Sequence, residues 1–342
     1  MEITSNIALG DWYRNTTNND LLYWGLDYPP LTAYHSYLCG VFANAVNPSM
    51  VALGSSRGFE SPIEKLFMRM TVQISDLIIF VPAIFLLVKY CNTSSRQRVD
   101  DKILMGKIKR LLIILFCLLQ PGLLLIDHGH FQYNGVCIGF ALLAAFAISK
   151  GEDVVASVLF CLSMNFKQMS LYYALIFFSA LLRQCFDSSD RLLLQLLQVL
   201  KLGLTVILTF GCLWVPFCVL HSSEETCLSS LLQVLHRQFP FSRGIFEDKV
   251  SNIWYSVSVV YDLRQVLSTQ QLVLCSLVLT LALTLPVCCN LLVNRFDLKR
   301  FLLALMNGSL AFFLASYQVP CIAVHSRYIV LVMLVVVVVV VS

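Results

Sequence analysis

The stretch LIIFVPAIFLLV, residues 77–88, is an uninterrupted apolar run near the first third of the chain. It lies at the centre of a longer apolar segment, roughly 70–90, which matches the ~20 residues that a helix needs to cross the hydrocarbon core of a bilayer. A chain inside lipid must satisfy its backbone hydrogen bonds internally. The run therefore predicts a membrane-spanning α-helix.

Similar runs follow along the rest of the chain and predict further spans. With the first, they occupy residues 70–90, 111–126, 134–149, 154–165, 169–182, 192–219, 271–293, 301–318 and about 322–341. Several are shorter than a straight span, so hydropathy predicts about eight to ten spans. The short segments 154–165 and 169–182 are expected to form a helical hairpin. The fold class that follows is an all-α, polytopic membrane protein.

Composition supports lipid as the solvent for much of the chain. Of its 342 residues, 58% are hydrophobic and 13% are charged, and the mean hydropathy is +0.77. Soluble domains carry about 25% charged residues. The net charge of +4 is spread out with no basic stripe, so nucleic-acid binding has no support. The thirteen cysteines lie mostly inside apolar runs, which argues against a disulfide framework and against a zinc site.

Positive charges predict the orientation of the spans. The loop 91–110 contains six lysines and arginines and the short loop 294–300 contains three, so the positive-inside rule assigns both to the cytosol. Alternation then places residues 1–65, the segment 127–133 and the loop at about 220–265 in the lumen. The predicted organisation is a luminal loop over 1–65 followed by a multi-span domain over 66–342.

Three N-x-S/T sequons begin at Asn15, Asn92 and Asn307. In the predicted topology, only the Asn15 sequon is clearly luminal. Sequons are common by chance, so Asn15 gives weak support to this orientation.

The strongest candidate site is YWGLDYPPLTAYH, residues 23–35, in which Asp27 stands among aromatic residues and before two prolines. Aromatic faces such as those of Trp24 and Tyr28 can stack on sugar rings, and a partly desolvated carboxylate can act as a base. The alternative is an aromatic belt at the membrane surface in which Asp27 caps the helix that begins at Pro29.

A second candidate is DHGHFQYN, residues 127–134, between two apolar runs. The histidines His128 and His130, if protonated, could bind a phosphate, whereas their i, i+2 spacing suits a helical metal site poorly. The alternative is a solvated turn in which Asn134 caps the next helix.

A third candidate is Lys167 in NFKQ, between two very apolar segments. An ionisable residue at membrane depth usually has a function or a partner, and phosphate binding is a reasonable role. The alternative is that its ammonium snorkels to the interface. Arg69 and Asp76, seven residues apart on one helix face, are expected to form a structural pair.

The fourth candidate is FPFSRGIFEDKV, residues 239–250. Its cations Arg243 and Lys249 could bind a phosphate, and its neighbouring acids could bind sugar hydroxyls. The alternative is an amphipathic surface helix with internal ion pairs.

Six stretches in this order resemble the dolichyl-phosphate-glucose-dependent glucosyltransferases of the endoplasmic reticulum, which have the GT-C fold. They are WGLDYPPLTAYHS (24–36), SRGFES (56–61), KLFMR (65–69), DHGHFQYNG (127–135), NFKQMSLYY (165–173) and RGIFEDKVSNIW (243–254). The last stretch is most similar to the family member that adds the first glucose to the lipid-linked oligosaccharide. The resemblance covers residues 3–319.

The resemblance implies a reaction in the assembly of the N-glycan precursor. Dolichyl phosphate glucose would donate glucose to dolichol-linked Man9GlcNAc2 in the lumen, with inversion, to form an α-1,3 linkage. It also implies that Asp27 is the base. The substrate-binding candidates are Trp24, Tyr28, His128, His130, Lys167, Arg243 and Lys249. No cofactor and no metal are implied.

Two departures from the family pattern predict a chain truncated at both ends. The family begins with a transmembrane helix before the luminal loop, whereas Met1 here lies inside that loop. After Val319 the family continues with a His-Glu-Lys-Ser-type motif, whereas this chain ends in a valine run. The alternatives therefore include the second-glucose enzyme, a non-catalytic membrane fragment and a transporter. A transporter would be expected to show more inward-facing charges and an internal repeat.

Overall fold

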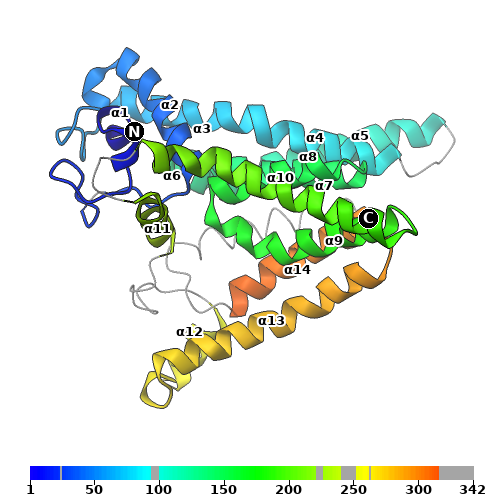
Figure 1. Ribbon diagram of the computed structural model, residues 1–342. Helices are drawn as coiled ribbons and strands as arrows, with labels where there is room; N and C mark the ends of the chain where they lie inside the picture. Colours follow the sequence, from blue (N-terminus) through cyan, green and yellow to red (C-terminus); the bar gives the residue numbers. More distant parts are fainter. Residues whose placement is uncertain (24, 94–99, 221–225, 240–251, 262, 316–342) are drawn as a thin grey trace.

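The computed structural model describes residues 1–315 except 24, 94–99, 221–225, 240–251 and 262, and within residues 91–106 it describes only the backbone (Figure 1). In these residues the chain is built from helices, turns and one isolated bridge between Thr16 and Asn19. The α-helices are α1 (Glu2–Asn6), α2 (Pro30–Val46), α3 (Pro62–Ser75), α4 (Val81–Thr93), α5 (Asp100–Leu118), α6 (His128–His130), α7 (Asn134–Ser149), α8 (Asp153–Phe166), α9 (Ala174–Asp187), α10 (Leu192–Val219), α11 (Cys227–Gln238), α12 (Ile253–Val260), α13 (Thr269–Val293) and α14 (Leu298–Ala315).

Six helical segments are long and apolar enough to cross a membrane. They are Pro62–Tyr90, Lys107–His130, Gln168–Asp187, Leu192–Val219, Thr269–Val293 and Leu298–Ala315. The shorter apolar helices α7 and α8 lie between the second and third of them in the sequence. The prediction of an all-α, polytopic membrane protein is thereby confirmed.

Eight of the nine predicted spans correspond to helices, and the ninth, about 322–341, lies outside the described residues. The first span begins at Pro62 and not near residue 70, because the Ser61 side chain caps α3 and Pro62 occupies its first turn. The second span continues to His130. The polar residues 127–130 are therefore the last turn of a helix and not the loop that the sequence predicted.

The chain runs back and forth between two ends of the bundle (Figure 1). At one end lie α1, α2, α11 and the start of α3. At the opposite end lie the end of α4, the start of α5, the connection between α9 and α10, and the connection between α13 and α14. The described parts of the two segments predicted to be cytosolic thus share the end that is remote from the Asp27 motif.

Helix α7 occupies the centre of the bundle, where it packs against α4, α8 and the π-helical turn η3 (Asp76–Phe80). Gly139 permits the close approach to η3, since a Cβ there would lie 3.0 Å from the Phe80 Cα. Between helices in lipid, van der Waals packing of this kind replaces the hydrophobic driving force. Gly135, four residues earlier, extends the same narrow face toward Asp76.

The N-terminal segment folds over one end of the bundle. Helix α1 packs on α2, and a small core joins this segment to the ends of α10 and α11. Its buried members are Ile3, Trp12, Tyr13, Ala33, Phe217 and Val234. The segment that contains Asp27 is therefore anchored on four helices.

Candidate functional site

Asp27 lies on a half-exposed loop directly before α2. The Tyr13 hydroxyl donates a hydrogen bond to the Tyr28 carbonyl at 2.7 Å, and the Arg237 Nε donates one to the Leu26 carbonyl at 3.1 Å. Helix α2 begins at Pro30 with Pro29 as its N-cap and no capping bond from a side chain. The N-cap position of this helix is therefore occupied by Pro29 and not by Asp27.

Lys167 is buried, with 4% of its surface exposed. Its Nζ donates hydrogen bonds to the Asn134 Oδ1 at 2.7 Å and to the Gln132 Oε1 at 3.0 Å. A primary ammonium has three donor hydrogens, and these two bonds hold it inside the bundle. The snorkelling alternative is therefore wrong for Lys167.

Asn134 connects the lysine to a buried carboxylate. Its Nδ2 donates to the Asp127 Oδ1 at 2.6 Å, and the Gly135 N–H donates to the Asp127 Oδ2 at 2.7 Å. Asn134 and Asp127 have no solvent-exposed surface. The alternative of a solvated turn with Asn134 as a helix cap is wrong, since α7 has Tyr133 as its N-cap and no capping bond from a side chain.

Two contacts join the Asp27 motif to this cluster. The Lys167 Nζ lies 5.7 Å from the centroid of the Tyr28 ring, a cation–π arrangement. The Thr32 hydroxyl on α2 donates to the Phe166 carbonyl at the end of α8. Three motifs, at residues 23–35, 127–134 and 165–168, therefore meet at one end of the bundle.

His128 forms an ion pair with Asp76, with 3.0 Å between Nε2 and Oδ2. Asp76 was expected to pair with Arg69, and this expectation is wrong: Asp76 is buried and faces α7, whereas Arg69 is exposed. His130 is also exposed. The two histidines thus occupy different environments, one against a buried acid and the other at the surface.

The two buried carboxylates, as distinct from Asp27, lie on π-helical turns: Asp76 at the start of η3 and Asp127 at the end of η4 (Leu123–Asp127). A π-turn inserts one residue into a helix and is frequent at functional sites. Gly135 lies against the first of these acids, because a Cβ there would stand 2.1 Å from the Asp76 Oδ1. Phe131, in the same motif, has a φ of 56°, a left-handed conformation that a bulky residue rarely adopts.

A neutral cluster of rings and hydroxyls surrounds His35 of α2. The His35 Nε2 is 3.1 Å from the Ser75 Oγ, and its ring packs edge-on against Tyr133 at 4.6 Å between centroids. The Tyr133 hydroxyl is 2.8 Å from the Thr71 Oγ1. Burial lowers the pKa of His35 and raises the pKa of Tyr133, so both are neutral near pH 7.

The structure brings together Tyr28, which follows Asp27 directly, and Lys167, whereas His128 contacts Asp76. Trp24, Arg243 and Lys249 lie outside the described residues. Sequence reasoning missed Tyr13 and Arg237, whose role is to bind backbone carbonyls around Asp27. No local pattern marks such residues. Among the described residues there is no group of three or more His, Cys, Asp or Glu that could hold a metal ion.

A disulfide joins Cys218, at the end of α10, to Cys227, at the start of α11. The sequence argued against disulfides, and for this pair that interpretation is wrong. The two cysteines flank a loop and do not lie within one apolar helix, so chain reversal brings them together. Disulfides persist in oxidising compartments such as the lumen of the endoplasmic reticulum.

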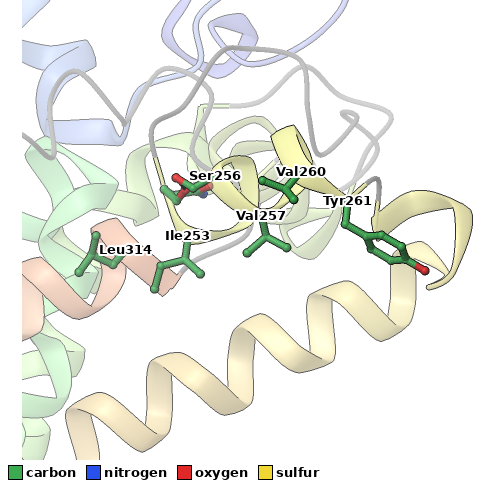
Figure 2. Close-up of a pocket in the computed structure, with 7 residues that line it drawn as sticks. Ile253, Ser256, Val257, Val260, Tyr261 and Leu314 are labelled. Atoms are coloured by element: carbon green, nitrogen blue, oxygen red, sulfur yellow. Dashed lines mark hydrogen bonds between the residues drawn. The ribbon is translucent and has the colours of Figure 1, made fainter.

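A separate groove of about 520 Å³ lies between α12 and α14 (Figure 2). Figure 2 shows the side chains of Ile253 and Val257 from α12 and Leu314 from α14 lining it. The lining is mostly apolar, and no residue of the Asp27 or Lys167 clusters contributes to it. The groove is therefore distinct from the polar site.

Comparison with known proteins gives a family match over the whole chain. A family model described as the ALG6, ALG8 glycosyltransferase family matches residues 1–342. A Gallus gallus protein named dolichyl pyrophosphate Man9GlcNAc2 alpha-1,3-glucosyltransferase is 45% identical over 93% of this chain and 59% of its own length. A mouse protein (Mus musculus) of the same name is 44% identical over 97% of this chain and 61% of its own length.

A Drosophila melanogaster protein with the same name preceded by "probable" is 45% identical over 93% of this chain and 63% of its own length. The chain therefore spans about three-fifths of the length of the curated relatives it matches.

Proposed function

Because the chain belongs to the ALG6, ALG8 glycosyltransferase family, we propose that it transfers glucose from dolichyl phosphate glucose to dolichol-linked Man9GlcNAc2. The helical, polytopic architecture is that of a GT-C membrane glycosyltransferase. The proposed product has an α-1,3-linked glucose, formed with inversion at the donor sugar. The relatives' names, which specify Man9GlcNAc2 and an alpha-1,3 linkage, support this acceptor and this bond.

The observation that carries the proposal is the meeting of the Asp27 loop with a buried cation. Inversion needs a base that removes the proton of the acceptor hydroxyl on the face opposite the leaving phosphate. Asp27 is half-exposed, so an acceptor can reach its carboxylate. Its loop is held on both sides by hydrogen bonds to the backbone, which preorganises the base.

The leaving dolichyl phosphate needs positive potential and no acid. The Lys167 ammonium is buried over the face of the Tyr28 ring and contributes its positive charge to this end of the bundle. We assign His128 and His130 to the rim of the donor site, and Arg243 and Lys249 to direct phosphate contact. Trp24 and Tyr28 are assigned to stacking on the sugar ring.

The active site is proposed to face the lumen of the endoplasmic reticulum. The Cys218–Cys227 disulfide supports this side, because it lies at the same end of the bundle as Asp27. The start of α5 and the connection between α13 and α14, both rich in lysine and arginine, lie at the opposite end, where the positive-inside rule expects the cytosolic face.

Glucose transfer in microsomes that lack the endogenous first-glucose enzyme tests the proposal. The chain is expressed beside an Asp27→Asn variant, dolichyl phosphate glucose is supplied, and the lipid-linked oligosaccharide is analysed. We expect one added glucose with the unmodified chain and none with the variant. Glucose added only to an acceptor that already carries one glucose would identify the second-glucose enzyme. No transfer by either protein, with both present in the membrane, would identify a non-catalytic fragment.

A further inference from the structure

We infer that Arg237 is a positioning residue for Asp27, and that helix α11 holds this arginine in place. The inference rests on the proposed function for the role of Asp27 as base. The ordering of the Asp27 loop by Arg237 can be measured independently of that role.

Arg237 donates a hydrogen bond to the backbone directly beside Asp27. The Leu26 carbonyl, which accepts from the Arg237 Nε at 3.1 Å, belongs to the peptide group that joins Leu26 to Asp27. The bond therefore restrains the rotation that aims the Asp27 side chain. A charged donor makes a stronger hydrogen bond to a carbonyl than a neutral donor does.

The Arg237 guanidinium lies against the loop beside Gly25. A Cβ on Gly25 would lie 2.9 Å from the Arg237 Nη2 and 2.5 Å from the Leu21 Cα. The close approach of the Leu21 backbone requires glycine at this position, and the absence of a Cβ also leaves room for the guanidinium beside the loop. The half-buried Arg237 thus occupies a position that the loop is shaped to accept.

A second hydrogen bond restrains the backbone on the other side of Asp27. The Tyr13 hydroxyl donates to the Tyr28 carbonyl at 2.7 Å. The Tyr13 ring is 2% exposed and packs edge-on against Phe217 at 5.3 Å. Burial raises the pKa of Tyr13, which keeps its hydroxyl protonated and able to donate. Asp27 is therefore bracketed by two donors from separate elements.

Helix α11 is anchored by a disulfide at its start and by packing along one face. Its first residue, Cys227, is bonded to Cys218 of α10, and the Thr226 side chain accepts from the Ser229 N–H as an N-cap. One turn before Arg237, Val234 is buried in the small core with Phe217. A helix fixed at its start and packed along one face presents the arginine of its last turn in one direction.

The test measures amide hydrogen exchange of peptides that cover residues 21–34 in the full-length chain, for the unmodified protein and Arg237→Met. We expect exchange in this segment to be faster by on the order of tenfold. Exchange of α7 and α8 is expected to stay unchanged, which shows that the variant is folded. Arg183→Met is the matched control, because Arg183 also donates to a backbone carbonyl, that of Leu292, at the opposite end of the bundle.

The same variants separate positioning from substrate binding when glucose transfer is measured. Arg237→Met should lower kcat by on the order of 10²-fold, the effect of an ångström-scale misplacement of a reacting group. The KM for dolichyl phosphate glucose should change by less than about twofold. Arg237→Lys, which retains a donor for the Leu26 carbonyl, should recover part of both kcat and the exchange protection.

Unchanged exchange over residues 21–34 in Arg237→Met would overturn the inference. A raised KM with an intact kcat would overturn it as well, since that result assigns Arg237 to ground-state binding of substrate. If the unmodified chain transfers no glucose, the proposed function fails, and the exchange result alone decides whether Arg237 orders the loop.

Discussion

The buried cluster around Lys167 and the loop that carries Asp27 lie side by side but are stabilised differently. The cluster consists of side chains that satisfy one another inside the bundle, from Lys167 through Asn134 to Asp127. The loop is half-exposed, and the donors that restrain its backbone come from Tyr13 and Arg237. The position of the buried charge thus follows from helix packing, whereas the backbone around the proposed base is restrained by hydrogen bonds from two other segments of the chain.

Lys167→Met is expected to have the largest effect on stability. It removes the buried ammonium that faces the Asp127 carboxylate across Asn134, together with the donor to Asn134 and Gln132, at a cost of ~3 kcal/mol. Thermal unfolding of the purified protein in detergent measures the change. Lys201→Met, on the exposed face of α10, is the control and should be close to neutral. Equal unfolding of the two variants would mean that the cluster is not a structural unit.

Gly135→Ala should come next. The added Cβ would stand 2.1 Å from the Asp76 Oδ1, so either the Asp76 carboxylate must move from its hydrogen bond with His128 or η3 and α7 must separate. Overpacking of this kind costs about 1–3 kcal/mol. Gly203→Ala on α10 is the matched control, because no atom lies within 4 Å of its added Cβ and alanine favours the helix. The opposite order of stability would contradict the close approach of α7 to Asp76.

Tyr13→Phe tests the loop rather than the cluster. Loss of the hydroxyl leaves the Tyr28 carbonyl without this donor and should cost about 1–2 kcal/mol. Amide exchange over residues 21–34 should rise while that of α7 and α8 does not. Tyr37→Phe, at an exposed tyrosine of α2, is the control.

The double variant Tyr13→Phe with Arg237→Met tests whether the two hydrogen bonds to the Asp27 loop act together. The two side chains restrain the same short segment, so their effects on exchange are expected to be non-additive. Strict additivity would show that the two contacts act on independent parts of the loop.

The Asn15 sequon tests the side of the membrane and should have the smallest energetic effect. Asn15 is exposed at the same end of the molecule as Asp27, whereas Asn307 lies within the spanning helix α14. In microsomes we expect an endoglycosidase-sensitive shift in gel mobility that Asn15→Gln abolishes and Asn307→Gln does not. Glycosylation of Asn15 would establish a luminal N-terminal segment. A cysteine-accessibility result that places residues 1–61 in the cytosol would contradict it.

Much of the architecture could be predicted because hydropathy is a local property of the chain. Apolar runs marked eight of the helices, and the glycine, proline and acidic residues of the 23–35 motif marked the loop before α2. The boundary of the second span was wrong. The polar residues 127–130 lower the local hydropathy, whereas in the fold Asp127 is satisfied by Asn134 and Gly135 and the helix continues.

The pairing of charges could not be predicted, and Asp76 shows why. Sequence spacing suggested Arg69, on the same helix face, but Asp76 lies on a π-turn that faces α7 and pairs with His128, 52 residues away. A single inserted residue in a helix turns every following side chain by about 100°. Such an insertion leaves no mark in the apolar pattern.

Hydropathy and local motifs were enough to establish a multi-span helical membrane protein with an acidic aromatic motif near its start. The groups that surround this motif became visible in the folded protein: the Lys167 ammonium over the Tyr28 ring, Tyr13 and Arg237 on the backbone around Asp27, and a disulfide that anchors α11. The reason is physical. Burial is dictated by the composition of each segment, whereas hydrogen bonds and ion pairs depend on which faces meet after distant segments have packed together.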